Sequence, residues 1–348
     1  MKNSEAATAM LLLPSKQDNR AVRSALMAMK VLPQDLTANK PGMSQLLESL
    51  QVMPHSMALI DLDALRPAMP TVLALAKFVD DPMLRQRVVL TRNSFGPVWA
   101  SDRAWVKQLG FCDMYPEMDS ASLVAESHDF LDHVAQITDV ASINPNVLSK
   151  YFSAMQVRLD GSAPRGLIRK ITGIDAESLC TLMASNVKSL DRTYRFKSYP
   201  SCFLGSDAVT WLSSHFRMQR DMALEVGLAL GKLGFVNHVV HEQAFADAPN
   251  FYRTAVSSSA DRLDLGAVLA AMVSKNGVEV RDRSYLGKNY PACFVGSEAV
   301  SWVHQNYKLP RHSAEAFLNR LYGFGLIHHV MDEHKVQDGN FFYRFNGA

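Results

Sequence analysis

The most constraining feature of this 348-residue chain is that one stretch of it occurs twice. Residues 187–212 and 278–303 align in register at a constant offset of 91, and the register continues without a gap to residues 251–253 and 342–344. The identical pairs are Asp191/Asp282, Arg192/Arg283, Tyr194/Tyr285, Tyr199/Tyr290, Pro200/Pro291, Cys202/Cys293, Phe203/Phe294, Gly205/Gly296, Ser206/Ser297, Ala208/Ala299, Val209/Val300 and Trp211/Trp302. Because a repeated unit fixes the architecture before local propensity does, we infer that the chain carries one small domain twice.

Length and charge limit the class of protein. A chain of this length holds two or three domains, and its 48% hydrophobic content can supply a core for each of them. The net charge of +2 is too small to indicate a polyanion-binding protein by excess alone. Any basic surface must therefore come from the arrangement of the charges.

The cysteines and the apolar runs indicate a cytoplasmic protein. Cys112, Cys180, Cys202 and Cys293 lie far apart and form neither a CxxC pair nor a zinc-type cluster, so we expect reduced, structural thiols. The apolar run at residues 10–13 is too short to span a bilayer and lacks the basic flank of a secretory signal. We expect a cytoplasmic protein, peripheral at most at the inner face of the membrane.

Residues 1–137 read as an α/β domain. Short apolar runs predict strands near residues 9–13, 36–38, 57–60, 87–91 and 112–115, and amphipathic stretches predict helices over 20–30, 44–50, 70–78, 100–109 and 123–137. Strands that alternate with helices predict a parallel sheet covered on both faces.

Five such βα units resemble the flavodoxin-like receiver domain of response regulators. Asp61 stands where the phosphate-accepting aspartate of that family ends the third strand, and Thr91 where a hydroxyl residue ends the fourth. Phosphoryl transfer to a carboxylate requires a metal ion. Here the acidic pair that holds it is absent after the first strand, and Tyr115 replaces the partner lysine. We therefore predict a pseudo-receiver with a structural Asp61, and keep phosphorylation of Asp61 as an alternative.

Residues 138–173 are predicted to be a helical linker. Val147, Leu148, Tyr151, Phe152 and Met155 recur at helical spacing. This apolar stripe can pack on its own domain or form a homodimer, as can the receiver-like domain itself. The sequence leaves both readings open.

The repeated module, predicted over residues 174–257 and 262–348, has the outline of a winged helix. A first helix (176–185, 265–274) precedes a β-hairpin whose basic tip in the second copy is Gly287-Lys288-Asn289. Ser206 and Ser297 are predicted to cap the next helix, with Trp211 and Trp302 in the core. A third helix (221–233, 313–322) and a closing two-stranded hairpin complete each copy.

These residues carry a resemblance to a known family. The motifs are Gly277-Val278-Glu279-Val280-Arg281-Asp282-Arg283, Tyr285-Leu286, Phe294-x-Gly-Ser-Glu-Ala-Val-x-Trp302, Gly325-Leu-Ile-x-His329 and Phe342-Tyr343-Arg344-Phe345. They resemble the DEP domain of Dishevelled, pleckstrin and several G-protein signalling regulators, and the first copy is similar from Asp191 onward. The resemblance implies recruitment to membranes or receptors through the projecting hairpin and its basic residues, without catalysis.

The candidate contact residues lie on or beside the two hairpins. They are Arg192, Tyr194, Arg195 and Lys197 in the first copy, and Arg281, Arg283, Tyr285, Leu286 and Lys288 in the second. An anionic surface would attract each basic residue by about 1 kcal/mol, and two copies could bind in concert. The alternative is that the shared Asp/Arg pair ties each hairpin to its own domain.

Other chemistries find less support. His328 and His329 are adjacent on a predicted strand and point to opposite faces, so we predict no metal site. The sequence contains no nucleophile elbow and no glycine-rich phosphate loop, so we predict neither catalysis nor a cofactor. DNA binding remains a rival, although the candidate recognition helices carry Asp221, Glu225 and Lys232, or Glu315 and Arg320, which neutralise few phosphates.

The sequence therefore favours a non-enzymatic signalling adaptor. It would dock on a protein partner or an anionic membrane surface through tandem DEP modules. The alternatives are a DNA-binding transcriptional regulator and a response regulator gated by phosphorylation of Asp61.

Overall fold

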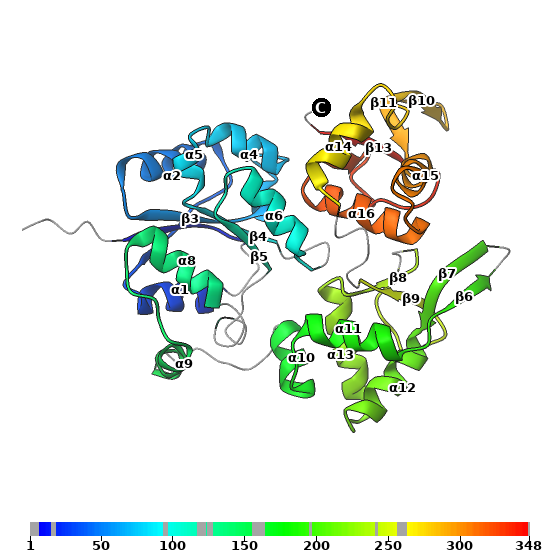
Figure 1. Ribbon diagram of the computed structural model, residues 1–348, viewed down its shortest axis with the longest axis horizontal. Coiled ribbons are helices and arrows are strands. Elements are labelled where there is room, and N and C mark those ends of the chain that lie inside the picture. The colour runs from blue at the N-terminus through cyan, green and yellow to red at the C-terminus, as the bar shows by residue number, and fades with distance from the viewer. Residues whose placement is uncertain are drawn as a thin grey trace, which may run out of the picture. The chain divides into compact units, whose positions relative to one another are not determined.

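The computed structural model describes residues 7–14, 19–92, 97–116, 123, 128–154, 164–194, 197–240, 243–255 and 263–346. The chain divides into two compact units, each described by itself below (Figure 1). The first unit comprises Met1–Asn93 with Asp102–Lys170, and the second comprises Ser94–Ser101 with Ile171–Ala348.

Within its described residues, the first unit is built on a five-stranded parallel sheet of order β2-β1-β3-β4-β5. The strands are β1 (Thr8–Leu12), β2 (Leu32–Asp35), β3 (Ser56–Asp61), β4 (Val88–Arg92) and β5 (Asp113–Pro116). This is the doubly wound order of flavodoxin-like sheets. The predicted parallel α/β architecture is confirmed.

The second strand lies at Leu32–Asp35, so the prediction of residues 36–38 was wrong. The strand is mostly exposed and contains Pro33. Because β2 is an edge strand, it tolerates a proline and needs no continuous apolar run, which removes the signal that sequence reading depends on.

Helices cover both faces of this sheet. Figure 1 shows α1 and α8 on one face and α2, α4 and α6 on the other. The described helices that belong wholly or mainly to this unit's sheet are α1 (Arg20–Ala28), α2 (Lys40–Val52), α3 (Leu62–Leu65), α4 (Val72–Phe78), α5 (Pro82–Arg85), α6 (Ala100–Gln108), α8 (His128–Thr138) and α9 (Pro145–Ala154). Leu148 and Phe152 of α9 are fully buried in the core that α1 and α8 form with the sheet. The apolar stripe of α9 thus packs on its own unit, while Val147 is exposed and Met155 lies outside the described residues.

The second unit contains the two repeats. After α10 (Pro164–Thr172), which crosses the boundary between the units, the first repeat runs α11 (Ala176–Asn186), β6 (Leu190–Tyr194), β7 (Lys197–Leu204), α12 (Gly205–His215), α13 (Arg220–Lys232), β8 (Val236–His238) and β9 (Phe251–Thr254). The second runs α14 (Leu265–Val273), β10 (Arg281–Tyr285), β11 (Lys288–Val295), α15 (Gly296–Tyr307), α16 (Arg311–Gly323), β12 (Ile327–His329) and β13 (Phe342–Phe345).

Each repeat forms an antiparallel four-stranded sheet among its described residues, of order β6-β7-β9-β8 or β10-β11-β13-β12. In the second repeat, residues 288–293 of β11 pair with β10, and only Phe294 and Val295 pair with β13. The β10–β11 hairpin therefore extends beyond the part of the sheet that joins the domain core.

The offset of 91 residues is preserved in the hydrogen bonds. The Tyr252 hydroxyl donates to the Ala244 carbonyl at 2.9 Å, and the Tyr343 hydroxyl donates to the Lys335 carbonyl at 2.8 Å. Equivalent side chains thus make equivalent bonds, which confirms that one fold occurs twice.

The predicted serine caps were wrong. The helices α12 and α15 begin at Gly205 and Gly296, and their N-cap residues make no side-chain capping bond. Loop carbonyls accept the first amides instead, as when Gly296 N donates to Phe341 O at 2.9 Å. A Cβ at Gly296 would lie 2.4 Å from the Gln337 carbonyl oxygen, so glycine is required for this close approach.

The two tryptophans are half-buried rather than fully buried in the core. Trp302 donates from its indole nitrogen to the Asn276 carbonyl at 3.2 Å, and Trp211 stacks on His215. An indole ring places its polar edge toward a partner at the rim of a core, which explains the difference from the prediction.

Candidate functional site

The β10–β11 hairpin of the second repeat ends in a two-residue turn at Leu286-Gly287, so the predicted tip Gly287-Lys288-Asn289 was placed too late, since Lys288 and Asn289 already belong to β11. Leu286 and Gly287 have φ values of 47° and 77°, and Tyr285 pairs with Lys288 across the turn. Two central residues with positive φ are typical of the type I′ turn, which matches the twist of the flanking strands. Glycine adopts this conformation readily, whereas leucine does not.

The side chains at this tip are apolar and basic. Leu286 is 85% exposed and Tyr285 is 54% exposed. Lys288, the first residue of the returning strand, is also exposed. We call Tyr285, Leu286 and Lys288 the hairpin tip. It offers two apolar side chains beside one cation, and the Tyr285 ring also makes an edge contact with the Phe342 ring of β13, with the centroids 6.4 Å apart.

The arginines nearer the root of the hairpin differ from one another. The Arg283 side chain is only 10% exposed, and its guanidinium lies 2.6 Å from the Glu298 carboxylate at the start of α15. Arg281 is exposed and lies 3.5 Å from Glu279. Arg283 is thus held by its own domain, while Arg281 stays on the surface.

The aspartates beside Arg283 and Arg192 are also held within their own domains, by backbone hydrogen bonds. Asp282 accepts a hydrogen bond from Ala292 N at 2.9 Å, and Asp191 accepts one from Ser201 N at 2.9 Å. Both donors lie at an irregularity where the strand register shifts, with φ near 48°. The Asp residues therefore stabilise the bend at the root of each hairpin.

The first repeat shows the same root and a less fully described tip. Arg192 lies 3.8 Å from Asp207 of α12, with its guanidinium over the Phe251 ring. Tyr194 is 55% exposed. Arg195 lies outside the described residues, and only the backbone of Lys197 is described. The side chains around the turn of the hairpin are thus described only in the second copy.

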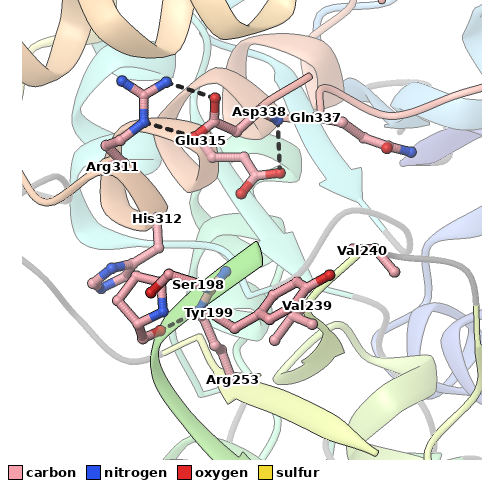
Figure 2. A pocket seen from close by; sticks show the side chains of 11 residues that line it. Ser198, Tyr199, Val239, Val240, Arg253, Arg311, His312, Glu315, Gln337 and Asp338 are labelled. Atoms are coloured by element: carbon pink, nitrogen blue, oxygen red, sulfur yellow. Dashed lines mark hydrogen bonds and ion pairs between the residues drawn. The ribbon is translucent and has the colours of Figure 1, made fainter. Parts of the chain in front are cut away.

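A cavity of about 360 Å³ lies in the second unit (Figure 2). The first repeat lines it with Tyr199, Pro200, Val239, Val240 and Arg253, and the second with Arg311, His312, Glu315, Gln337 and Asp338. Figure 2 shows the Arg311 guanidinium against the Asp338 carboxylate, at 2.7 and 2.6 Å. Burial lowers the pKa of Arg253, and burial with the nearby Arg253 charge lowers the pKa of His312.

The sequence reasoning did not identify this cavity. The sequence did contain one signal for it, the arginine of the closing Phe-Tyr-Arg motif that both repeats share. This arginine holds the base of each hairpin, since Arg253 and Arg344 donate to the carbonyls of Pro200 and Pro291 at 3.1 and 2.9 Å. The pairing of unlike faces from the two repeats left no trace in the local pattern.

In the first unit, Asp61 is fully buried at the end of β3. Its carboxylate accepts hydrogen bonds from Asp63 N at 2.9 Å, Ala64 N at 3.1 Å and the Thr91 hydroxyl at 3.1 Å. Burial, with a smaller contribution from the Asp63 charge, raises the pKa of Asp61 to about 6. The carboxylate therefore caps α3 and is screened from solvent.

Tyr115, in the position of the receiver lysine, is also buried. Its hydroxyl lies 2.6 Å from His133 Nδ1, and the Arg103 guanidinium lies 5.0 Å from its ring centroid. The neighbouring Asp113 carboxylate receives two hydrogen bonds from Arg103. This end of the sheet is thus filled by a connected set of side chains.

The described residues contain no group of three or more His, Cys, Asp or Glu side chains that could hold a metal ion. No helix among them combines the length and the apolar character needed to cross a membrane.

Comparison with known proteins identifies the repeats. The family model "Domain found in Dishevelled, Egl-10, and Pleckstrin (DEP)" matches residues 186–254 and 277–345, which are the two repeats.

Similar proteins include two groups of much longer chains. The phosphatidylinositol 3,4,5-trisphosphate-dependent Rac exchanger 1 protein of Mus musculus is 28% identical over 49% of this chain, which covers 11% of that protein. The vacuolar membrane-associated protein iml1 of Emericella nidulans is 34% identical over 24% of this chain, covering 5% of its own length. The chain thus spans about a tenth or less of these relatives.

Proposed function

Because the chain carries two DEP domains in tandem, we propose that it is a non-enzymatic signalling adaptor that docks on an anionic membrane surface through the hairpin tip. The observation that carries this proposal is Leu286, which is 85% exposed in a backbone conformation that leucine disfavours. A strained, exposed apolar residue costs stability in the free protein, so its presence favours a contact made elsewhere.

The energetics of the tip suit a bilayer surface. Moving a leucine side chain out of water is worth roughly 1.5–3 kcal/mol. A lysine near an anionic surface adds about 1 kcal/mol, and the half-exposed ring of Tyr285 suits the interface between headgroups and acyl chains. The hairpin tip alone binds weakly on this account, and a second contact through the first repeat of the same chain would raise the effective affinity.

The names of two relatives also support a role at a membrane. One is named as dependent on phosphatidylinositol 3,4,5-trisphosphate, and the other as associated with the vacuolar membrane. A membrane-linked signalling role is the function that agrees best with these names and with the exposed hairpin tip.

For the first unit, the proposal is a pseudo-receiver that serves as an interaction module without accepting phosphate. The 2-1-3-4-5 strand order supports a receiver-like fold. The burial of Asp61 and the replacement of the lysine by a buried tyrosine support the loss of phosphoryl transfer. Phosphorylation would require Asp61 to leave three hydrogen-bond donors and meet a metal ion.

Co-sedimentation with liposomes tests the proposed docking. The full chain should bind vesicles that contain phosphatidylserine, and binding should fall with added salt and in Lys288→Glu. Lys308→Glu is the matched control, since Lys308 is the exposed C-cap residue of α15 in the same domain and lies outside the hairpin. If both variants lost vesicle binding equally, the effect would be one of net charge alone. The proposal would be refuted if the parent showed no salt-sensitive binding.

A further inference from the structure

The two repeats present unlike faces to the cavity of Figure 2. We call Tyr199, Pro200, Val240 and Arg253 of the first repeat the hairpin-base face. The opposing helix face is formed by Arg311, His312 and Glu315 at the start of α16. Since the same fold supplies both sides, the contact is head-to-tail and leaves one face of each kind over.

The counterparts of both faces follow from the offset of 91. The hairpin-base face of the second repeat is Tyr290, Pro291, Met331 and Arg344, which keeps the tyrosine, the proline and the arginine. The helix face of the first repeat is Arg220, Asp221 and Leu224 at the start of α13.

Exposure distinguishes the used faces from their counterparts. Pro200 and Val240 are half-buried, whereas Pro291 and Met331 are exposed, Met331 at 50%. Likewise Arg311 and His312 are half-buried, whereas Arg220 and Asp221 are exposed. These four counterpart residues are thus more exposed than the residues that line the cavity, while Tyr290 and Arg344 are half-buried like Tyr199 and Arg253.

The charges of the two counterpart faces match. His312 and Arg253 line the same cavity, and burial together with the Arg253 charge lowers the pKa of His312. Asp221 occupies the position of His312 in the first repeat, so the equivalent contact would set the Asp221 carboxylate beside the Arg344 guanidinium. The flanking ion pair is also kept, with Arg220–Asp247 at 2.5 Å in place of Arg311–Asp338.

Apolar groups accompany this charge pair. Met331 on the hairpin-base face and Met222, next to Asp221, are both exposed large side chains. Methionines adapt their shape to a partner surface, and an interface needs an apolar centre inside its charged rim.

We propose that a second copy of this chain binds here: the hairpin-base face of the second repeat receives the helix face of the first repeat of the next molecule. The contact repeats the one within the chain, with Arg344 and Asp221 in the places of Arg253 and His312. Because the faces are unlike, the association extends in one direction and produces rings or open chains.

Sedimentation velocity on the full chain tests this directly. The weight-average sedimentation coefficient should rise over an about 100-fold range of concentration. Asp221→Lys and Arg344→Glu should each weaken association by about tenfold or more, because like charges then face each other. Combining both changes in one chain restores opposite charges at every contact, so the double variant should regain association.

Three controls keep the test decisive. Arg344 donates to Pro291, so the circular dichroism of its variant must match the parent, while exposed Asp221 gives an independent arm. Lys288→Glu should leave association unchanged, and Asp221→Lys should leave single-site liposome affinity unchanged, which separates this proposal from the membrane function. The proposal would be overturned if the protein were a monomer at every concentration, or if neither single variant weakened its association. The hairpin-base face would then belong to another partner.

Discussion

Leu286→Asn should stabilise the second repeat and weaken membrane binding at the same time. Leu286 holds a φ of 47° at the first central position of the hairpin turn, followed by Gly287 at 77°. The left-handed conformation costs an ordinary residue about 1 kcal/mol. Asn-Gly is the preferred pair for this turn because asparagine tolerates positive φ.

The magnitudes of the two effects have opposite signs. We expect the free energy that holds the hairpin closed to rise by about 0.5–1 kcal/mol, the part of the strain that asparagine relieves. The loss of an inserted leucine should weaken liposome binding by roughly 10-fold to 100-fold, from 1.5–3 kcal/mol of lost burial. A residue that served only the fold would show no such opposition.

Two assays on the same protein measure these effects. Hydrogen exchange of the amides in β10 and β11 reports the local stability of the hairpin, and co-sedimentation with phosphatidylserine vesicles reports binding. Val280→Asn is the control, since Val280 is 45% exposed but lies before the hairpin with no positive φ. If Leu286→Asn slowed exchange while leaving vesicle affinity intact, the reasoning that assigns the strain to membrane contact would be refuted.

Three further predictions concern residues that the tertiary structure explains. Gly296→Ala should lower the free energy of unfolding by roughly 1–3 kcal/mol in urea titration, because its Cβ would meet the Gln337 carbonyl oxygen at 2.4 Å; an unchanged midpoint would contradict this. Arg283→Ala should lower it by roughly 1 kcal/mol and change vesicle binding less than about twofold, since the side chain pairs with half-exposed Glu298; a larger binding loss would return Arg283 to the contact surface. The pKa of Asp61 is raised from 3.8 to about 6, so the folded state holds this proton more tightly, and the contribution of Asp61 to stability falls as pH rises through that window. Asp61→Asn should therefore lose less unfolding free energy than the parent between about pH 4 and 7, by roughly 2–3 kcal/mol, and acetyl phosphate should label neither protein. Parallel plots of unfolding free energy against pH, or labelling of the parent that Asp61→Asn abolishes, would show the assignment to be wrong.

The paired arginines show where sequence reading and structure separate. Arg192 and Arg283 stood among the contact residues because they lie on hairpin strands with other cations. The structure places Arg283 against Glu298, 15 residues further along the chain, and Arg192 against Asp207. The sequence had held this structural reading open, but the choice depends on the angle at which the hairpin meets the following helix, which no local pattern encodes.

Asp61 and Tyr115 show the same division in the first unit. The sequence placed Asp61 at the end of the third strand and identified the missing lysine and acids. It could not reveal that Asp61 is fully buried beneath three donors, or that His133 of α8 meets the Tyr115 hydroxyl. Residues 18 positions apart become neighbours only when the sheet and its covering helix have packed.

By itself, the sequence determined the features that depend on local periodicity and on self-comparison: the duplicated domain, the alternation that produces a parallel sheet, and the hairpin with its turn glycine Gly287. Only the tertiary structure decided which charges face inward, why Gly205 and Gly296 must be glycine, and which faces of the two repeats meet around Arg253 and Glu315. The reason is physical: hydrophobic pattern and turn chemistry act over a few residues, whereas close approach, ion pairing and burial arise between segments that the chain brings together from far apart.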